Sequence, residues 1–205
     1  MDPIAAAPDA ALDGRVQRTI RSRAAVVDAI LDLLVEGNPQ PTAQQVSDRS
    51  GVSMRSIFRL FDDMASLHRA AAARQAERLV AMFVPLSDEG PLAARIEALA
   101  GHRADVYEAI TPVRRAAVRL AATSPHIAAE LSRVAGMFRV QVASTFRAEL
   151  AGAGPEVLDA VDLVASWEAW ERLRVVQGLS VPTATATLAA ALAALLGPTA
   201  GTAGT

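Results

Sequence analysis

Apolar residues recur every three or four positions along almost the whole 205-residue chain, and this spacing most limits what the chain can fold into. Such spacing places apolar side chains on one face of an α-helix, whereas a half-buried strand needs strict alternation, and we find no alternating stretch. Prolines stand at the starts of several of these stretches, where the first helical turn tolerates them. The sequence therefore predicts an all-α protein.

Glycine and proline divide this pattern into consecutive helices. The apolar face of the first is formed by Ile20, Ala24, Val27, Ile30, Leu31 and Leu34. Gly37, Asn38 and Pro39 end that helix, and two short helices follow it. A long helix then runs from Met64 toward Pro85. The remaining expected helices cover residues 91–110, 112–122, 125–151, 155–178 and 182–196.

The domain organisation follows from these boundaries. Residues 1–13, rich in alanine, proline and aspartate, are expected to be a disordered tail. A first domain is expected over residues 14–63, a linking helix over 64–90, a second helical domain over 91–198, and a short disordered tail over 199–205. With 52% apolar residues the chain can bury a substantial core.

Composition excludes several classes of function. The chain has no cysteine, which rules out disulfides, thiolate metal sites and cysteine nucleophiles. His68, His102 and His126 follow no metal-binding spacing, and no glycine-rich nucleotide loop is present. We therefore expect no catalytic residue, no metal and no cofactor, and a helical enzyme is the least favoured interpretation. No signal-peptide pattern precedes the first helix, so we expect a cytoplasmic protein.

Charge is distributed unevenly. The net charge of −2 argues against a uniformly basic nucleic-acid coat and leaves only a local patch. Residues 14–60 hold seven arginines against four acids, and the whole chain has arginine but no lysine. This local excess fits either a nucleic-acid contact or a solvated helix surface.

The stretch GVSMRSIFRLF, residues 51–61, follows the second helix. Gly51 can take the positive φ that a tight turn between helices needs. Ser53 can cap the helix after this turn, and Thr42 can cap the helix before it. The inward stripe of the later helix consists of Ile57, Leu60 and Phe61. Two helices joined in this way make a helix-turn-helix.

This arrangement resembles the TetR family of bacterial transcriptional regulators, most clearly over residues 21–67. The residues that carry the resemblance are Thr42, Val46, Gly51, Val52, Ser53, Phe58, Arg59, Phe61 and Leu67. The segment SWEAWERLRVVQGLS and the apolar helix after it are similar to the dimer-forming end of many members. The resemblance implies an N-terminal three-helix helix-turn-helix DNA-binding domain and a C-terminal helical ligand-binding and dimerisation domain.

The resemblance also implies that the helix from Ser53 to about Phe61 lies in the major groove of double-stranded DNA. The predicted DNA-binding residues are Thr42, Ser53, Met54, Arg55, Ser56, Phe58 and Arg59. Arg55 is the expected base reader, because arginine bonds guanine O6 and N7 in a bidentate manner. Thr42, Ser53 and Arg59 are the expected phosphate contacts, with Met54 and Ser56 as further base-edge candidates. A second group (Arg15, Arg18, Arg21 and Arg23) is either a basic arm on DNA or a solvated cluster.

For the C-terminal half the resemblance implies a homodimer on a palindromic operator and a pocket for an unidentified small effector. The predicted ligand-binding residues are Met82, Phe83, His102, Tyr107, Phe138, Trp167 and Trp170; plain core packing is the alternative interpretation of each. The stretch ATATLAAALAALL, residues 184–196, is uncharged and nearly all apolar, yet too short to span a membrane. It is expected at a subunit interface or in a monomeric core.

Two functional hypotheses remain. The first is a TetR-like repressor whose operator binding is relieved by a small, mainly apolar ligand. The second is a helical ligand-binding or interaction protein with weak or no specific DNA binding. It rests on Phe58, Leu60 and Met64, which stand where the family usually has polar residues, and on Asp62 and Asp63 directly after the expected recognition helix.

Overall fold

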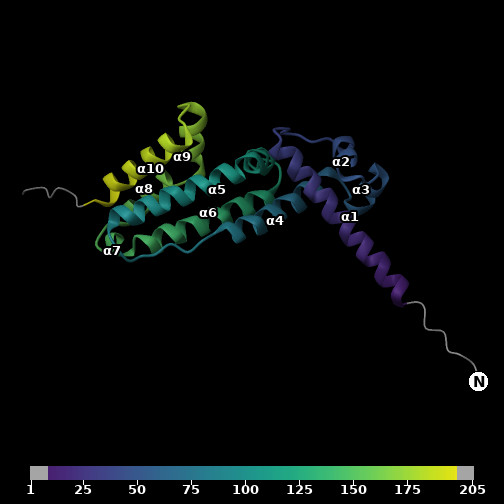
Figure 1. Ribbon diagram of the computed structural model, residues 1–205, viewed down its shortest axis with the longest axis horizontal. Helices are drawn as coiled ribbons and strands as arrows, with labels where there is room; N and C mark the ends of the chain where they lie inside the picture. Colours follow the sequence, from purple (N-terminus) through teal and green to yellow (C-terminus); the bar gives the residue numbers. More distant parts are fainter. Residues whose placement is uncertain (1–8, 198–205) are drawn as a thin grey trace, which may run out of the picture. The chain divides into compact units, whose positions relative to one another are not determined.

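The computed structural model describes residues 9–197, which form helices with no strand among them (Figure 1). The elements are α1 (Asp9–Val35), α2 (Ala43–Ser50), α3 (Met54–Leu60), α4 (Met64–Met82), α5 (Leu92–Ala121), α6 (Pro125–Thr145), α7 (Arg147–Leu150), α8 (Pro155–Val164), α9 (Trp167–Glu171), the π-helical segment η1 (Arg172–Val176) and α10 (Val181–Leu196). The prediction of an all-α protein is confirmed.

The chain divides into two compact units. Unit 1 consists of Met1–Glu77 and Pro112–Ile127, and unit 2 of Arg78–Thr111 and Ala128–Thr205. Each unit therefore combines segments that are distant in the sequence, whereas the sequence predicted contiguous domains. The physical reason is that Val113 and Ala116, from the second half of α5, are buried in the same hydrophobic cluster as α1 to α4.

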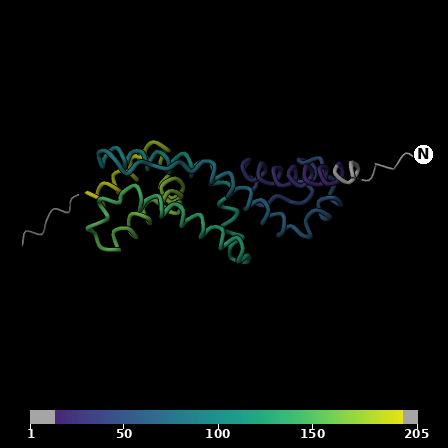
Figure 2. The backbone as a smooth tube through the Cα atoms, turned by 90° about the horizontal axis from the view of Figure 1, so that it is seen from below, coloured from purple at the N-terminus to yellow at the C-terminus, as the bar shows by residue number. Residues whose placement is uncertain are grey.

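Unit 1 contains the helix-turn-helix, in which α2 and α3 pack on α1 (Figure 2). Its buried cluster consists of Val26, Val27, Ala29, Ile30, Leu31, Leu34, Val46, Ile57, Phe61, Leu67, Ala71, Val113 and Ala116. The last three turns of α1 supply six of these thirteen side chains, more than any other helix. The two short helices each add only one buried residue within their bounds, Val46 in α2 and Ile57 in α3. The position of each short helix therefore depends on its one buried side chain and on the capped turn between the two helices.

Local hydrogen bonds define that turn. Thr42 caps α2 in a capping box: its hydroxyl accepts from the Gln45 amide, and the Gln45 side chain accepts from the Thr42 amide at 2.9 Å. Gly51 ends α2 with φ +69°, and its amide donates to the Ser47 carbonyl. Ser53 then caps α3 by accepting from the Ser56 amide. All three capping predictions are confirmed.

Unit 2 holds two hydrophobic clusters. The first contains Leu79, Ala104, Val106, Tyr107, Ile110, Val134, Phe138, Trp167, Trp170 and Ala184. The second contains Ile96, Leu99, Ala100, Val142, Phe146, Val161, Ala165, Leu188, Leu192 and Leu196. In this second cluster α8 and α10 pack against each other. Both clusters take side chains from α5, α6 and α10.

Several predicted helix boundaries are wrong. Pro112 begins no helix and lies inside α5. The predicted helix over 125–151 is divided at Phe146 into α6 and α7, and the one over 155–178 is divided at Ala165, after which Ser166 caps α9. In each case buried neighbours override the local pattern, since Phe146 and Ala165 are themselves core residues.

The N-terminal prediction also changes. Helix α1 begins at Asp9, so residues 9–13 are helical, while residues 1–8 and the predicted tail over 199–205 lie outside the described part of the chain. Ile20, assigned to the buried face, is 55% exposed, and Ala24 is exposed as well. Burial begins in the following turn, where α2 and α3 cover the helix.

Gly51 provides a test of the turn. Its φ is positive and a Cβ would meet no atom within 4 Å, so Gly51→Ala adds backbone strain without a clash. We expect the free energy of unfolding to fall by about 1–2 kcal/mol, the cost of the left-handed conformation for an L-residue. The measurement is urea unfolding followed by circular dichroism.

Gly136→Ala is the matched control. Gly136 lies inside α6, is exposed and also has free space around its Cα. Alanine there should raise stability by about 0.5–1 kcal/mol, because it restricts the unfolded chain and favours helix. Equal effects of the two substitutions would contradict this account of the turn.

Candidate functional site

The outward surface of α3 combines apolar and cationic side chains. Met54 is 38% exposed and Phe58 is 44% exposed, and Arg55 and Arg59 lie beside them. Each pair is four residues apart and therefore shares a helix face. Ile57 is buried beneath them, so the helix presents one face to unit 1 and the opposite face to solvent.

The arginines of unit 1 fall into two groups. Arg49 forms a bidentate ion pair with Glu36, at 2.8 and 2.6 Å. Arg23 donates to the Leu60 carbonyl at 2.7 Å and lies 4.2 Å above the Phe61 ring. Both therefore stabilise the helix-turn-helix itself, and for Arg23 these contacts fit neither a free basic arm nor a merely solvated cluster.

Arg55 and Arg59 behave differently. Within the described residues neither guanidinium has a hydrogen-bond or ion-pair partner. Their donors are free for an external acceptor. Arg15, Arg18 and Arg21 are also exposed, but they lie on the continuous helix α1 and not on a separate arm.

A groove of about 620 Å³ runs between the N-terminal part of α1 and the helix-turn-helix. It is lined by Arg15, Arg18, Thr19, Ser22, Gly51, Val52, Ser53, Ser56, Arg59 and Leu60. Three of these residues are cationic and four carry hydroxyl groups, and the lining includes no acid. Such a surface attracts anions, because guanidinium and hydroxyl groups both donate hydrogen bonds to phosphate oxygens.

The predicted phosphate contacts have structural partners. The Thr42 hydroxyl contacts Gln45, and the Ser53 hydroxyl contacts the Ser56 hydroxyl at 3.1 Å. Their exposed side chains therefore serve as caps. Of the two acids after α3, Asp63 accepts a hydrogen bond from the Ser66 amide at 2.6 Å and caps α4. This hydrogen bond lowers the pKa of the Asp63 carboxyl group.

The structure brings together the predicted ligand-binding residues in unit 2. Tyr107, Phe138, Trp167 and Trp170 are buried in its first cluster, with Met82 and Phe83 packed against it. His102 completes the set, because its ring lies edge-on to Phe83 at 6.1 Å between centroids. Burial lowers the pKa of His102, which favours the neutral imidazole.

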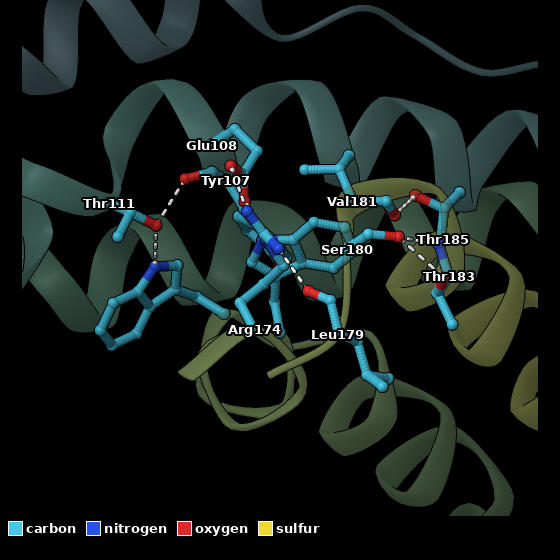
Figure 3. A network of polar contacts seen from close by, with 11 residues as sticks. Tyr107, Glu108, Thr111, Arg174, Leu179, Ser180, Val181, Thr183 and Thr185 are labelled. Atoms are coloured by element: carbon cyan, nitrogen blue, oxygen red, sulfur yellow. Dashed lines mark hydrogen bonds and ion pairs between the residues drawn. The ribbon is translucent and has the colours of Figure 1, made fainter. Parts of the chain in front are cut away.

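Hydrogen bonds connect the indole groups of Trp167 and Trp170 to residues of α5 (Figure 3). The Trp167 indole donates to the Thr111 hydroxyl at 2.9 Å, and the Trp170 indole donates to Glu108 at 2.9 Å. Arg174 adds an ion pair to Glu108 at 2.9 Å and also donates to the Leu179 carbonyl. These bonds give both tryptophans a structural role that their spacing did not reveal.

One buried polar residue of this region is absent from the predicted set. Arg103 is fully buried between the aromatic side chains of unit 2. A signal was present in the sequence, because Arg103 continues the apolar stripe formed by Leu99, Val106 and Ile110. A charged residue in such a stripe is buried when the helix packs on that face.

The part of the chain that the structure describes holds neither a metal-binding cluster nor a membrane-spanning helix. No group of three or more His, Asp or Glu side chains there is placed to hold a metal ion. None of the described helices has the length and hydropathy that crossing a bilayer requires.

Comparison with known proteins identifies the architecture. No protein-family model and no curated protein matches this sequence. A crystal structure of a tetR-family transcriptional regulator from Streptomyces coelicolor superposes with a TM-score of 0.69, over 85% of this chain and 79% of that chain. The sequence identity is 24%. The chain has a TetR-like fold. The fold implied by residues 21–67 is therefore confirmed.

The capping box of this TetR-like helix-turn-helix can be tested through Thr42. Thr42→Ala removes the hydroxyl that accepts from the Gln45 amide and should lower the free energy of unfolding by about 1 kcal/mol. Thr42→Ser keeps the oxygen and should retain most of that stability. Thermal and urea unfolding of the two variants provide the comparison, and equal losses would show that the hydroxyl does not stabilise α2.

Proposed function

We propose that the chain is a DNA-binding transcriptional regulator that acts as a homodimer in the cytoplasm. Its simplest mode is repression, in which a small, mainly apolar ligand relieves operator binding. The observation that carries the proposal is the unpaired Arg55 and Arg59 on the exposed face of a capped α3, within a TetR-like fold.

The chemistry of α3 favours double-stranded DNA as the partner. Arg55 stands in the first turn of the helix, and in helix-turn-helix proteins the N-terminal residues of this helix contact base edges. Arg59 lies one turn later and also lines the acid-free groove, where phosphate is the fitting acceptor. Met54 and Phe58 offer apolar contacts for a thymine methyl group.

The proposed dimer uses α8 and α10. Helix α10 carries no charge, and only one of its faces is buried within the chain, by Ala184, Leu188, Leu192 and Leu196. Its opposite face exposes the small residues Thr183, Ala186, Thr187, Ala190, Ala193 and Ala194. Leu163 in α8 and Val176 at the end of η1 are each 69% exposed. A second copy would remove this uncharged surface from water.

The DNA-binding proposal is tested by selection from a random 30-base-pair duplex library, followed by fluorescence anisotropy on the selected and a scrambled duplex. We expect the selected duplex to bind at least about 10³-fold more tightly. Arg55→Ala should reduce this preference, since one bidentate contact discriminates by about 1–3 kcal/mol. Arg59→Ala should weaken binding to both duplexes and flatten the salt dependence.

Two further variants complete the design. Arg15→Ala combined with Arg18→Ala should act like Arg59→Ala, because both side chains line the same groove. Arg172→Ala removes an exposed arginine from unit 2 and should leave binding unchanged. Failure to enrich any sequence, with equal affinity for all duplexes, would favour the alternative of a ligand-binding or interaction protein without an operator.

The dimer prediction concerns the exposed face of α10. Light scattering at micromolar concentration should give twice the chain mass of 21.4 kDa. Ala190→Arg places a charge on this face and should give the monomer mass, whereas Ala129→Arg, at an exposed position of α6, should leave the dimer intact. A wild-type mass of one chain would refute the dimer.

A further inference from the structure

Arg103 is a buried cation that lacks a carboxylate partner. Its guanidinium donates to two neutral acceptors, Gln141 Oε1 at 2.5 Å and the Phe138 carbonyl at 3.1 Å. Its Nε atom is buried and has no hydrogen-bond partner. No ion pair to Arg103 is formed by any acid in residues 14–197. The side chain is nevertheless fully buried.

Arg95, in the same helix, has the carboxylate partner that Arg103 lacks. It is also buried, but Glu149 receives two hydrogen bonds from it, one of them at 2.9 Å. That hydrogen bonding raises the pKa of Arg95, whereas burial lowers the pKa of Arg103. Asp162 acts on Arg103 electrostatically but already pairs with Arg139 at 3.3 Å. An arginine keeps its charge in a protein, so Arg103 carries a buried positive charge that no carboxylate neutralises.

Two aromatic rings lie beside this cation. The guanidinium carbon lies 4.3 Å from the centroid of Phe138 and 5.9 Å from that of Tyr107. Phe83 contacts Phe138 with 5.9 Å between centroids. His102 Nε2, on the residue next to Arg103, is a second buried atom without a hydrogen-bond partner. Apolar walls with a few polar groups directed between them are typical of small-molecule sites.

We propose that unit 2 binds a small carboxylate with an apolar body, whose carboxylate pairs with Arg103 and whose body lies among Phe83, Tyr107 and Phe138. This inference rests on the effector-controlled function proposed above and specifies the chemistry of the effector. A carboxylate accepts two parallel hydrogen bonds from a guanidinium, which Gln141 cannot do with its single oxygen. Phe83 is only partly buried, so the group of aromatic rings beside Arg103 reaches the molecular surface at this residue.

The same contacts connect the site to α4. Gln141 accepts from Arg103 and donates through Nε2 to the Val84 carbonyl at 2.7 Å. A carboxylate on Arg103 replaces Gln141 as acceptor and so loosens the bond to Val84. Val84 lies two residues after the end of α4, a helix that begins in unit 1. Ligand binding therefore acts on the C-terminal end of α4.

Isothermal titration calorimetry on the full chain at pH 7.5 tests the proposal without DNA. The probes are octanoate, decanoate and 3-phenylpropanoate, each against its primary amide, which has nearly the same shape and no charge. We expect at least one carboxylate to bind at least about tenfold more tightly than its amide, a difference of about 1.4 kcal/mol. Quenching of Trp167 and Trp170, the two tryptophans of the chain, provides an independent signal from the same cluster.

Arg103→Met should bring each carboxylate within about twofold of its amide, whereas Arg172→Met, an exposed arginine of unit 2, should preserve the preference. If Arg103→Met shows no cooperative melting transition, Arg103→Lys is measured in its place. A preference for the carboxylate over its amide that is reduced at least threefold in Arg103→Lys supports the proposal, and an unchanged preference contradicts it. Amides that bind as tightly as carboxylates, an Arg103→Met variant that keeps the preference, or no carboxylate binding below 1 mM would each overturn it. DNA binding is measured separately, so either proposal can fail alone.

Discussion

All three hydrophobic clusters of the described residues take side chains from one helix, α5. Ile96 and Leu99 enter one cluster, Val106 and Ile110 a second, and Val113 the third. A helix of 30 residues is about 45 Å long, which is enough to serve several clusters in succession. Everything that packs on α5 therefore depends on its continuity, including the turns that follow Val113.

The continuity of α5 is maintained although a proline inside the helix destabilises it. Pro112 lies inside α5 and cannot donate the backbone hydrogen bond expected at its position, a loss of about 3 kcal/mol in a helix interior. Ile110 and Val113, on either side of it, are both buried, and burial of each side chain contributes about 1.5–3 kcal/mol. Packing on both sides of the proline offsets its cost, and the helix continues.

Arginine supplies every cationic side chain of this protein, and its surroundings give it distinct roles. Paired with a carboxylate, as in Arg49, it ties α2 to the segment after α1. Over an aromatic ring, as in Arg23, it holds α1 against the end of α3. Exposed without a partner, as in Arg55, it offers all its donors to another molecule. Buried without a carboxylate, as in Arg103, it leaves a positive charge in the interior that a bound anion would neutralise.

The sequence by itself determined the helical class, the helix-turn-helix and its caps. These features are local: Thr42 reaches Gln45, and Gly51 closes on Ser47, all within four residues. The aromatic residues expected to gather in the C-terminal half do so, because helical spacing places them on inward faces. The uncharged character of α10 was likewise evident before any packing was known.

Only the tertiary structure decided which partner each of these side chains meets. Trp170 is bonded to Glu108 and Arg103 to Gln141 across separations of 62 and 38 residues, which no local pattern encodes. The same holds for Pro112, because whether a proline starts or interrupts a helix depends on the burial of its neighbours. Helix formation is set by near neighbours in the chain, whereas burial and ion pairing are set by segments that meet only after folding.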